Sequence, residues 1–244
     1  MYTTFATVYD QLMAEVPYEK WAMHYLRLIK KAKCFGEKCV ECACGSGSLT
    51  IPLQKAGMKM TGVDFSESML EIAIKRAGKA GETIPFIHQD MCKFSLPSTV
   101  GVVLCTCDGV NYLTKEKQLS SFFACAYHAL GAGGTLIFDV STPYKLLEFL
   151  GDTRTYVEPS YAYIWHNAVN KIKKTVKMDL TIFTKNPTNT YDRTEETQVQ
   201  RAWEMQELTQ ALEKAGFSSV MLYSNMSMQK AKEQDTRWHI VATK

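Results

Sequence analysis

The residues from 39 to 64 place a turn of small side chains at a fixed distance before an acid. The turn 43–47 has little or no side chain at alternate positions. A nucleoside can therefore approach its backbone, and the N–H groups that open the next helix point towards it. Asp64 closes the next apolar stretch, seventeen residues after Gly47, where a carboxylate can accept hydrogen bonds from ribose hydroxyls. The pattern predicts a nucleotide site.

Two features that the sequence lacks narrow the choice of nucleotide. A dinucleotide fingerprint requires a third glycine three residues after Gly47, and Thr50 stands there. A phosphate-binding loop requires Gly-Lys-Ser/Thr, and no lysine follows these glycines. NAD, ATP and GTP are thus disfavoured. Asp64 has one alternative role, capping of the helix after Ser66, but its position at a strand end favours ribose.

Glu41-Cys42-Ala43-Cys44-Gly45-Ser46-Gly47 resembles the first motif of class I S-adenosylmethionine-dependent methyltransferases. The resemblance covers nearly the whole chain and includes the segments 62–70, 90–91, 108–113 and 130–134. These segments are similar to the small-molecule branch of the family, which contains amino-sugar N-methyltransferases and many uncharacterised bacterial relatives.

The resemblance implies S-adenosylmethionine as cofactor and implies its contacts residue by residue. The methionine part would meet the backbone at Ala43, Gly45 and Gly47, and Glu41 would orient the turn or the cofactor's ammonium. The remaining implied cofactor contacts are Asp64, Phe65, Met69, Asp90, Met91, Cys107 and Asp108. Tyr9-Asp10 resembles a pair that closes over the cofactor, with Tyr18 and Trp21 as further lid residues.

Methyl transfer from a sulfonium is an in-line displacement, so the protein mainly supplies alignment and desolvation. We expect Tyr9, Asn111 and Glu196 to act on the acceptor. Relatives often place a histidine in a pattern like Glu-x-His-x-x-Arg-Ala, but Gln198 stands at that position here. Either the substrate needs no imidazole, or a group such as Glu196 or Tyr9 takes its role. His128 is interpreted as a helix residue, and the role of His166 stays open.

Apolar stretches near 38–44, 58–64, 84–89, 100–107 and 135–140 predict strands that alternate with helices at 17–33, 66–77 and 114–130. Alternation of this kind predicts an α/β fold with a parallel sheet. By resemblance, this is a Rossmann-like methyltransferase fold with seven mostly parallel strands and a reversed last strand. Between strand five and residue 203 we expect an antiparallel insert of three strands. The expected units are a lid segment at 1–36, a core at 37–142 and 203–244, and the insert at 143–202.

The bulk composition is that of a globular protein, with 244 residues, 46% hydrophobic and 22% charged. A net charge of +3, with no basic cluster among aromatics, disfavours a nucleic-acid substrate. No signal peptide or run of eighteen apolar residues is present, so we expect a cytoplasmic protein without membrane contact. We expect a small-molecule acceptor, with an amine preferred over a hydroxyl or thiol, and a monomer or homodimer. The alternatives are an RNA or protein methyltransferase, or a noncatalytic cofactor-binding subunit.

Eight cysteines in such a chain predict reduced thiols rather than disulfides. Cys42/Cys44 and Cys105/Cys107 end two strands that should be neighbours, so a four-thiolate metal site is geometrically conceivable. Cys-x-Cys is not the usual zinc spacing, and a role as small apolar side chains beneath the cofactor explains these residues better. We therefore expect no metal.

Overall fold

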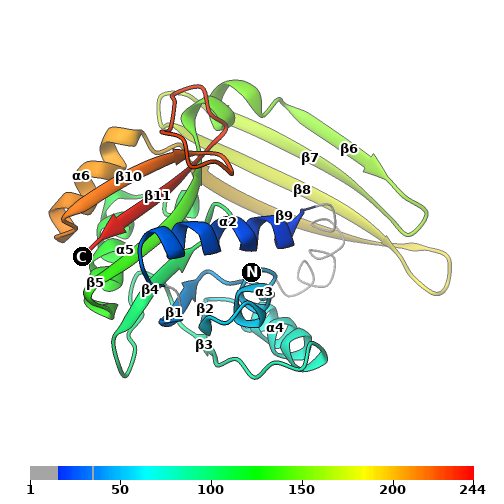
Figure 1. Ribbon diagram of the computed structural model, residues 1–244. Helices are drawn as coiled ribbons and strands as arrows, with labels where there is room; N and C mark the ends of the chain where they lie inside the picture. Colours follow the sequence, from blue (N-terminus) through cyan, green and yellow to red (C-terminus); the bar gives the residue numbers. More distant parts are fainter. Residues whose placement is uncertain (1–15, 35) are drawn as a thin grey trace.

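A seven-stranded sheet forms the centre of the larger part of the molecule, with strand order β10-β11-β5-β4-β1-β2-β3 (Figure 1). The computed structural model describes residues 16–34 and 36–244. The strands are β1 (Lys38–Cys42), β2 (Lys59–Asp64), β3 (Phe86–His88), β4 (Val100–Cys105), β5 (Leu130–Ser141), β10 (Ser219–Ser224) and β11 (Arg237–Thr243). Only β11 is reversed, since it pairs antiparallel with both β5 and β10. The predicted sheet with its reversed last strand is confirmed.

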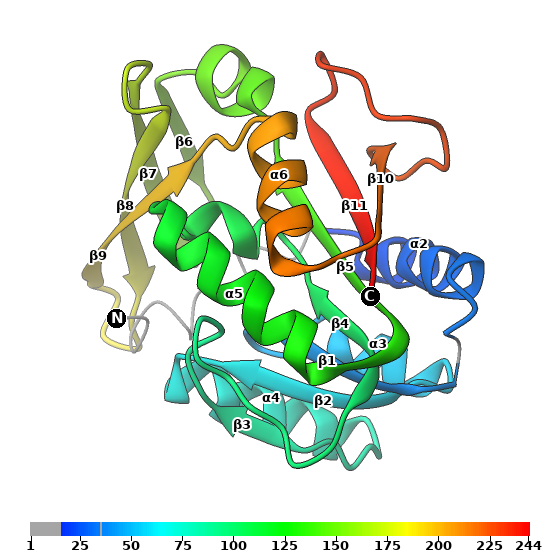
Figure 2. The same cartoon turned by 90° about the vertical axis from the view of Figure 1, so that its left-hand side faces the viewer.

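Helices cover both faces of this sheet, because alternate side chains of its central strands are apolar on both sides. On β4, Val102 and Leu104 belong to one core cluster, and Val103 and Cys105 belong to the other. The first cluster is covered by α2 (Tyr18–Lys31), α3 (Thr50–Lys55) and α4 (Glu67–Lys79). The second is covered by α5 (Glu116–Ala129) and α6 (Met205–Ala215), which Figure 2 shows across the sheet from α2.

Local signals fix the ends of two helices. The Ser66 hydroxyl accepts a hydrogen bond from the N–H of Met69 at 3.3 Å and caps α4. Gly216 ends α6 with a φ of 105°, a left-handed conformation that glycine adopts without steric cost. The start of α4 agrees with the helix predicted at 66–77. No helix within 16–34 and 36–244 is long and apolar enough to cross a membrane.

The insert is a separate antiparallel sheet of four strands, not three, and it projects beyond the seven-stranded sheet (Figure 1). Its strands are β6 (Thr153–Val157), β7 (Tyr161–Asn170), β8 (Thr175–Lys185) and β9 (Tyr191–Arg201). Our prediction missed β6, and also the π-helix Tyr144–Phe149 that precedes it. The side chains of β6 are almost all exposed, so the strand carries no apolar alternation and is defined only by its pairing with β7.

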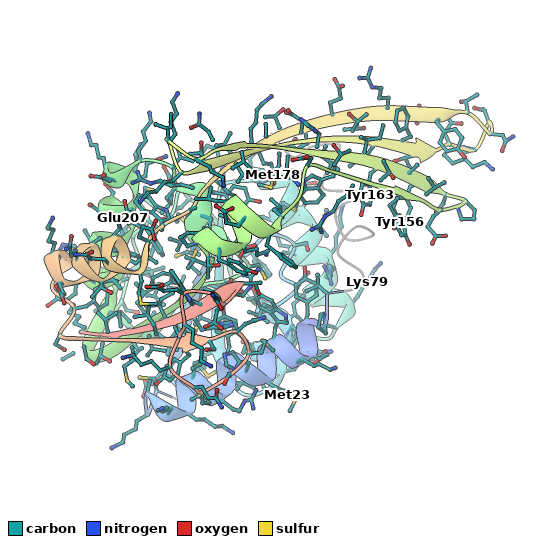
Figure 3. All side chains as sticks on the ribbon, turned by 90° about the horizontal axis from the view of Figure 1, so that it is seen from above. Met23, Lys79, Tyr156, Tyr163, Met178 and Glu207 are labelled. Carbon is teal, nitrogen blue, oxygen red and sulfur yellow. The ribbon has the colours of Figure 1, made fainter. Side chains whose placement is uncertain are left out.

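One face of the insert packs against the core. Leu180 and Ile182 of β8 share a buried cluster with Met69 of α4, and Met178 shares another with Leu146 of the π-helix. In Figure 3 the side chains of Met178, Tyr163 and Tyr156 lie on this same side of the sheet. The insert therefore stands over the edge where the parallel strands of the core end, which is where open α/β sheets bind ligands.

Candidate cofactor and acceptor site

A cavity of about 270 Å³ lies at the carboxyl ends of β1, β2 and β4. Its walls come from the turn after β1, the ends of β2 and β4, the segment after β3, α2, α4 and one strand of the insert. The lining residues are Tyr18, Glu41, Ala43, Cys44, Gly45, Ser46, Ser48, Leu49, Asp64, Phe65, Met69, Gln89, Asp90, Met91, Thr106, Cys107, Gly109, Tyr112 and Gln198. The seven-stranded core and the four-stranded insert thus both contribute to one cavity.

The turn after β1 brings bare backbone to this cavity. Ala43, Gly45 and Gly47 all have positive φ, at 55°, 54° and 76°. The N–H of Gly45 donates to Asp64 Oδ2 at 2.7 Å, which ties the turn to the end of β2. Gly47 borders an adjoining hollow rather than the cavity itself. A Cβ on Gly47 would lie 3.3 Å from the Cβ of Ala73, so its role is close packing of the turn on α4.

Asp64 both holds this turn and lines the cavity. Its second carboxylate oxygen accepts the N–H of Ser66 at 2.8 Å. Burial raises the pKa of Asp64, and its backbone hydrogen bonds act in the opposite direction. The capping role that we weighed against ribose binding belongs to Ser66, because at the start of α4 Asp64 accepts only the N–H of that cap residue. Phe65 follows with 72% of its surface exposed, an aromatic face available to a base.

Glu41 lies at the floor of the cavity. Its two carboxylate oxygens accept hydrogen bonds from the hydroxyls of Thr50 at 2.5 Å and Thr106 at 2.6 Å. Burial raises the pKa of Glu41 to about 7, although both threonine hydroxyls act to lower it. A buried carboxyl of this kind becomes a favourable partner for a cation once a cation enters the cavity.

The wall beyond β3 is formed by Asp90 and Met91, with Met69 of α4 also at the cavity. Asp90 Oδ1 accepts the N–H of Cys92 at 2.8 Å, which orients the segment. A carboxylate at this wall can accept a hydrogen bond from an exocyclic amine.

In the segment after β4, only one of the two predicted cofactor contacts lies at the cavity. Cys107 lines the cavity, but Asp108 is absent from its lining. The Asp108 carboxylate pairs with Arg237 and accepts the Ser141 hydroxyl at 2.9 Å. The Asp108 side chain thus turns towards the sheet and away from the cavity lining, whereas the resemblance implies a contact with the cofactor.

Asn111 lies outside the cavity as well, contrary to the expected role at the acceptor. It is completely buried, and its Nδ2 donates to the carbonyls of Ser141 and Arg201, each at 2.9 Å. Its Oδ1 accepts the N–H of Ser141 at 2.9 Å. All of its polar groups are engaged with backbone, so Asn111 joins β5 to the end of β9. Its neighbour Tyr112 reaches the cavity instead.

The insert contributes its inner face to the site. The hydroxyl of Tyr112 donates to Gln198 Oε1 at 2.8 Å, which links the core to β9 across the cavity. Glu196 lies two residues along β9 on the same face, opposite Leu180. Its Oε1 is buried and has no hydrogen-bond partner in the part of the chain that the structure describes. Burial raises the pKa of Glu196.

Of the four lid residues, Tyr9 and Asp10 lie outside the described residues. Tyr18 lines the cavity. Trp21 does not line the cavity. Its ring packs against Arg237, whose guanidinium carbon lies 4.8 Å from the ring centroid. The two histidines left for interpretation are remote from the site: His128 is exposed on α5, and His166 is exposed and bonds to Thr153 Oγ1 at 3.0 Å.

Sequence reasoning missed Thr106, the partner of Glu41, although a single polar residue at the end of an apolar strand was a usable signal. It also missed Gln89, whose only signal is its position beside Asp90.

All eight cysteines are free thiols. Cys42 and Cys105 face each other in register, yet no three histidine, cysteine or acidic side chains among residues 16–34 and 36–244 are grouped to hold a metal ion.

Comparison with known proteins agrees with this geometry. Residues 39–134 match the family described as a methyltransferase domain. Over 245 aligned residues the chain is 32% identical to GWCH70_2453 of Geobacillus sp. (strain WCH70), whose name carries the word methyltransferase and states no acceptor; the match covers 100% of this chain and 99% of that protein.

Two solved structures share the fold. An S-adenosylmethionine-dependent methyltransferase from Clostridium acetobutylicum ATCC 824 superposes with a TM-score of 0.87 at 24% identity, covering 99% of this chain and 98% of the other. The sugar N-methyltransferase KedS8 from Streptoalloteichus sp. ATCC 53650 superposes with a TM-score of 0.79 at 16% identity, covering 97% and 92% of the two chains.

Proposed function

Because this chain belongs to the S-adenosylmethionine-dependent methyltransferases, we propose that it transfers the methyl group of S-adenosylmethionine to an amine of a small molecule. The enzyme class and the cofactor are given by the family. The choice of an amine and the residues that serve it form the proposal.

The cofactor would lie along the cavity from Glu41 to Asp90. Its α-ammonium group is matched by the Glu41 carboxyl beneath the turn, and its ribose hydroxyls by Asp64. The adenine would lie between Phe65 and Met91, with its amino group towards Asp90. These groups bind and orient the cofactor, while the chemistry of the methyl group is supplied by the sulfonium itself.

The observation that carries the amine proposal is the buried Oε1 of Glu196, which has no hydrogen-bond partner among the described residues. An unpaired buried oxygen is costly, so a ligand that supplies an N–H to it gains binding energy. Glu196 flanks the cavity, because Gln198 lies in its lining and Leu180, opposite Glu196, belongs to the same buried cluster as the lining residue Met69.

The same carboxyl has a role in the reaction. An amine attacks through its lone pair and becomes an ammonium, which must lose a proton after transfer. A carboxyl whose pKa is raised by burial is a better proton acceptor than an ordinary one at neutral pH. Tyr112 and Gln198, joined by their hydrogen bond, would hold the acceptor in line with the methyl group. The similarity in fold to a sugar N-methyltransferase supports this assignment.

Incubation with radiolabelled S-adenosylmethionine and separate pools of small amines, alcohols and phenols, thiols, RNA and protein tests the proposal. We expect label in the amine pool, in products stable to mild base. At limiting cofactor, Asp64→Ala should give about ten- to a hundredfold less label, which distinguishes this chain from a contaminating enzyme. Label only in another pool would contradict an amine acceptor.

Once an acceptor is identified, Glu196→Gln should lower kcat/KM by about a hundredfold or more, since general acid–base catalysis contributes about 10²–10⁴-fold. Its matched control is Glu195→Gln, the adjacent residue on the outer face of β9, which is exposed and pairs with Arg193. The control should change kcat/KM by less than about twofold. Equal effects of the two substitutions would remove Glu196 from the reaction.

A further inference from the structure

The segment that carries the cavity wall after β4 has an uncommon backbone. Cys107 and Asp108 are consecutive and both left-handed, with φ of 55° and 65°, and neither is glycine. Side chains with a Cβ are strained in this region, and such residues persist only where their surroundings hold them. Thr106, Cys107 and Gly109 all line the cavity, so whatever holds this turn also sets the shape of the cofactor site.

The holding group is the carboxylate of Asp139 on β5. Its Oδ1 accepts the N–H of Cys107 at 2.7 Å, and its Oδ2 accepts the N–H of Asp108 at 3.1 Å. Asp139 is completely buried. Both strained residues are thus fixed through their own backbone by one side chain from the neighbouring strand, at a place where no solvent competes.

Asp139 is itself held from two further elements. The hydroxyl of Tyr25 on α2 donates to its Oδ1 at 2.5 Å, and Arg237 on β11 pairs with its Oδ2. Arg237 also pairs with Asp108, so it binds both the anchor and the anchored turn. Burial acts to raise the pKa of Asp108, but the charges of Arg237 and Lys145 outweigh it, so this pKa is lowered. Every partner of Asp139 is a hydrogen-bond donor.

The two histidine rings packed beside Tyr25 add no positive charge to this cluster. His24 and His239 are buried beside Tyr25, and burial lowers the pKa of each to about 3, so both rings are neutral. The cluster of Tyr25, Asp139, Arg237 and Asp108 therefore brings α2, β5 and β11 together on the turn after β4.

We propose that Asp139, oriented by Tyr25 and Arg237, is a positioning residue that holds the Cys107–Asp108 turn in the shape that binds the cofactor. The effect extends to Glu41, because Thr106 at the start of the turn donates to it. The inference rests on the cofactor lying in this cavity and is independent of which acceptor is methylated.

Calorimetric binding of S-adenosylhomocysteine tests the inference without any acceptor. In Asp139→Asn an amide N–H₂ replaces one carboxylate oxygen and faces groups that are all donors, so the turn loses an anchor. We expect affinity to fall by about tenfold or more. Tyr25→Phe keeps the ring and removes one donor to Asp139, so affinity should fall by about two- to fivefold. Unchanged affinity in both folded variants would overturn the proposal.

A control separates positioning from general loss of stability. Phe138 neighbours Asp139 on β5, but its buried ring belongs to the opposite core cluster. Phe138→Leu should lower the melting temperature and leave S-adenosylhomocysteine affinity within about twofold when measured well below the transition. Loss of affinity in Phe138→Leu equal to that in Asp139→Asn would indicate a merely structural role.

The most specific readout is a double-mutant cycle with Cys107→Gly. Glycine adopts positive φ without steric cost, so it should need the Asp139 anchor less. The ratio of S-adenosylhomocysteine affinities with and without Cys107→Gly should therefore be higher in the Asp139→Asn background than in the wild type, by at least about threefold. If Asp139→Asn does not fold, the same cycle is run on Tyr25→Phe. Additive effects would overturn the proposal.

Discussion

The two ends of the cavity are built in different ways. At the proposed cofactor end, left-handed backbone at Gly45 and Cys107 is held by carboxylates from neighbouring strands. At the acceptor end, side chains project from an added sheet, and Tyr112 and Gln198 meet through one hydrogen bond. The difference suggests that the first end is tuned to one ligand, whereas the second can change its specificity through a few side chains without disturbing the core.

The largest loss of cofactor affinity is expected from substitution of Asp64. Asp64→Ala removes a charged acceptor for ribose and also releases the N–H of Gly45. We expect a loss of about 1.5–3 kcal/mol in binding of both S-adenosylmethionine and S-adenosylhomocysteine, roughly ten- to a hundredfold in affinity. Calorimetry checks this, with circular dichroism to verify that the variant is folded. Unchanged affinity would mean that the cofactor does not lie on β2.

The second test of the same end is its pH dependence. The pKa of Glu41 is raised by burial to about 7, and binding of an α-ammonium requires its ionised form. S-adenosylhomocysteine should therefore bind more weakly as pH falls below 7, by up to about tenfold for each unit. Glu41→Gln should flatten this dependence between pH 6 and 7.5. A profile that is identical in wild type and variant would assign the titration to another group.

The same shift has a consequence for stability without ligand. Because the folded pKa of Glu41 lies above its ordinary value of 4.5, the folded chain keeps a proton that the unfolded chain has lost between about pH 4.5 and 7. The contribution of Glu41 to the free energy of unfolding is therefore largest below pH 4.5 and decreases as pH rises to 7.

Sequence reasoning reached most of the cofactor end because its signals are local. The spacing of Ala43, Gly45 and Asp64 follows from a strand, a turn and the next strand, and all three line the cavity. The alternating apolar stretches likewise predicted the five strands β1 to β5, and the family resemblance supplied the full seven-stranded sheet with its reversed last strand. The exposed strand β6 escaped prediction because only its pairing with β7 defines it.

Where the structure turns a predicted site residue away from the cavity, long-range contacts decide the direction of its side chain. Asp108 and Asn111 stand at a strand end, a position typical of ligand contacts, but the first pairs with Arg237 on the last strand and the second bonds to backbone of β5 and β9. A sequence pattern does not give the partner that lies 129 residues away. The same reason hid Asp139, whose position within an apolar strand gave no sign that it binds the turn after β4.

The smallest expected effect lies at the acceptor end and completes the comparison. Tyr112→Phe removes the hydrogen bond to Gln198 while the ring remains at the cavity. Since a single neutral hydrogen bond contributes about 0.5–1.5 kcal/mol, the KM for an identified acceptor should rise by about two- to tenfold. Affinity for S-adenosylhomocysteine should stay within about twofold, because neither residue anchors the turns after β1 or β4. Tyr127→Phe on α5, which packs against Phe217 far from the cavity, is the matched control and should change neither quantity. If Tyr112→Phe weakened cofactor binding as strongly as acceptor binding, the two ends would share one set of residues, and the division between a fixed cofactor end and an adaptable acceptor end would fail.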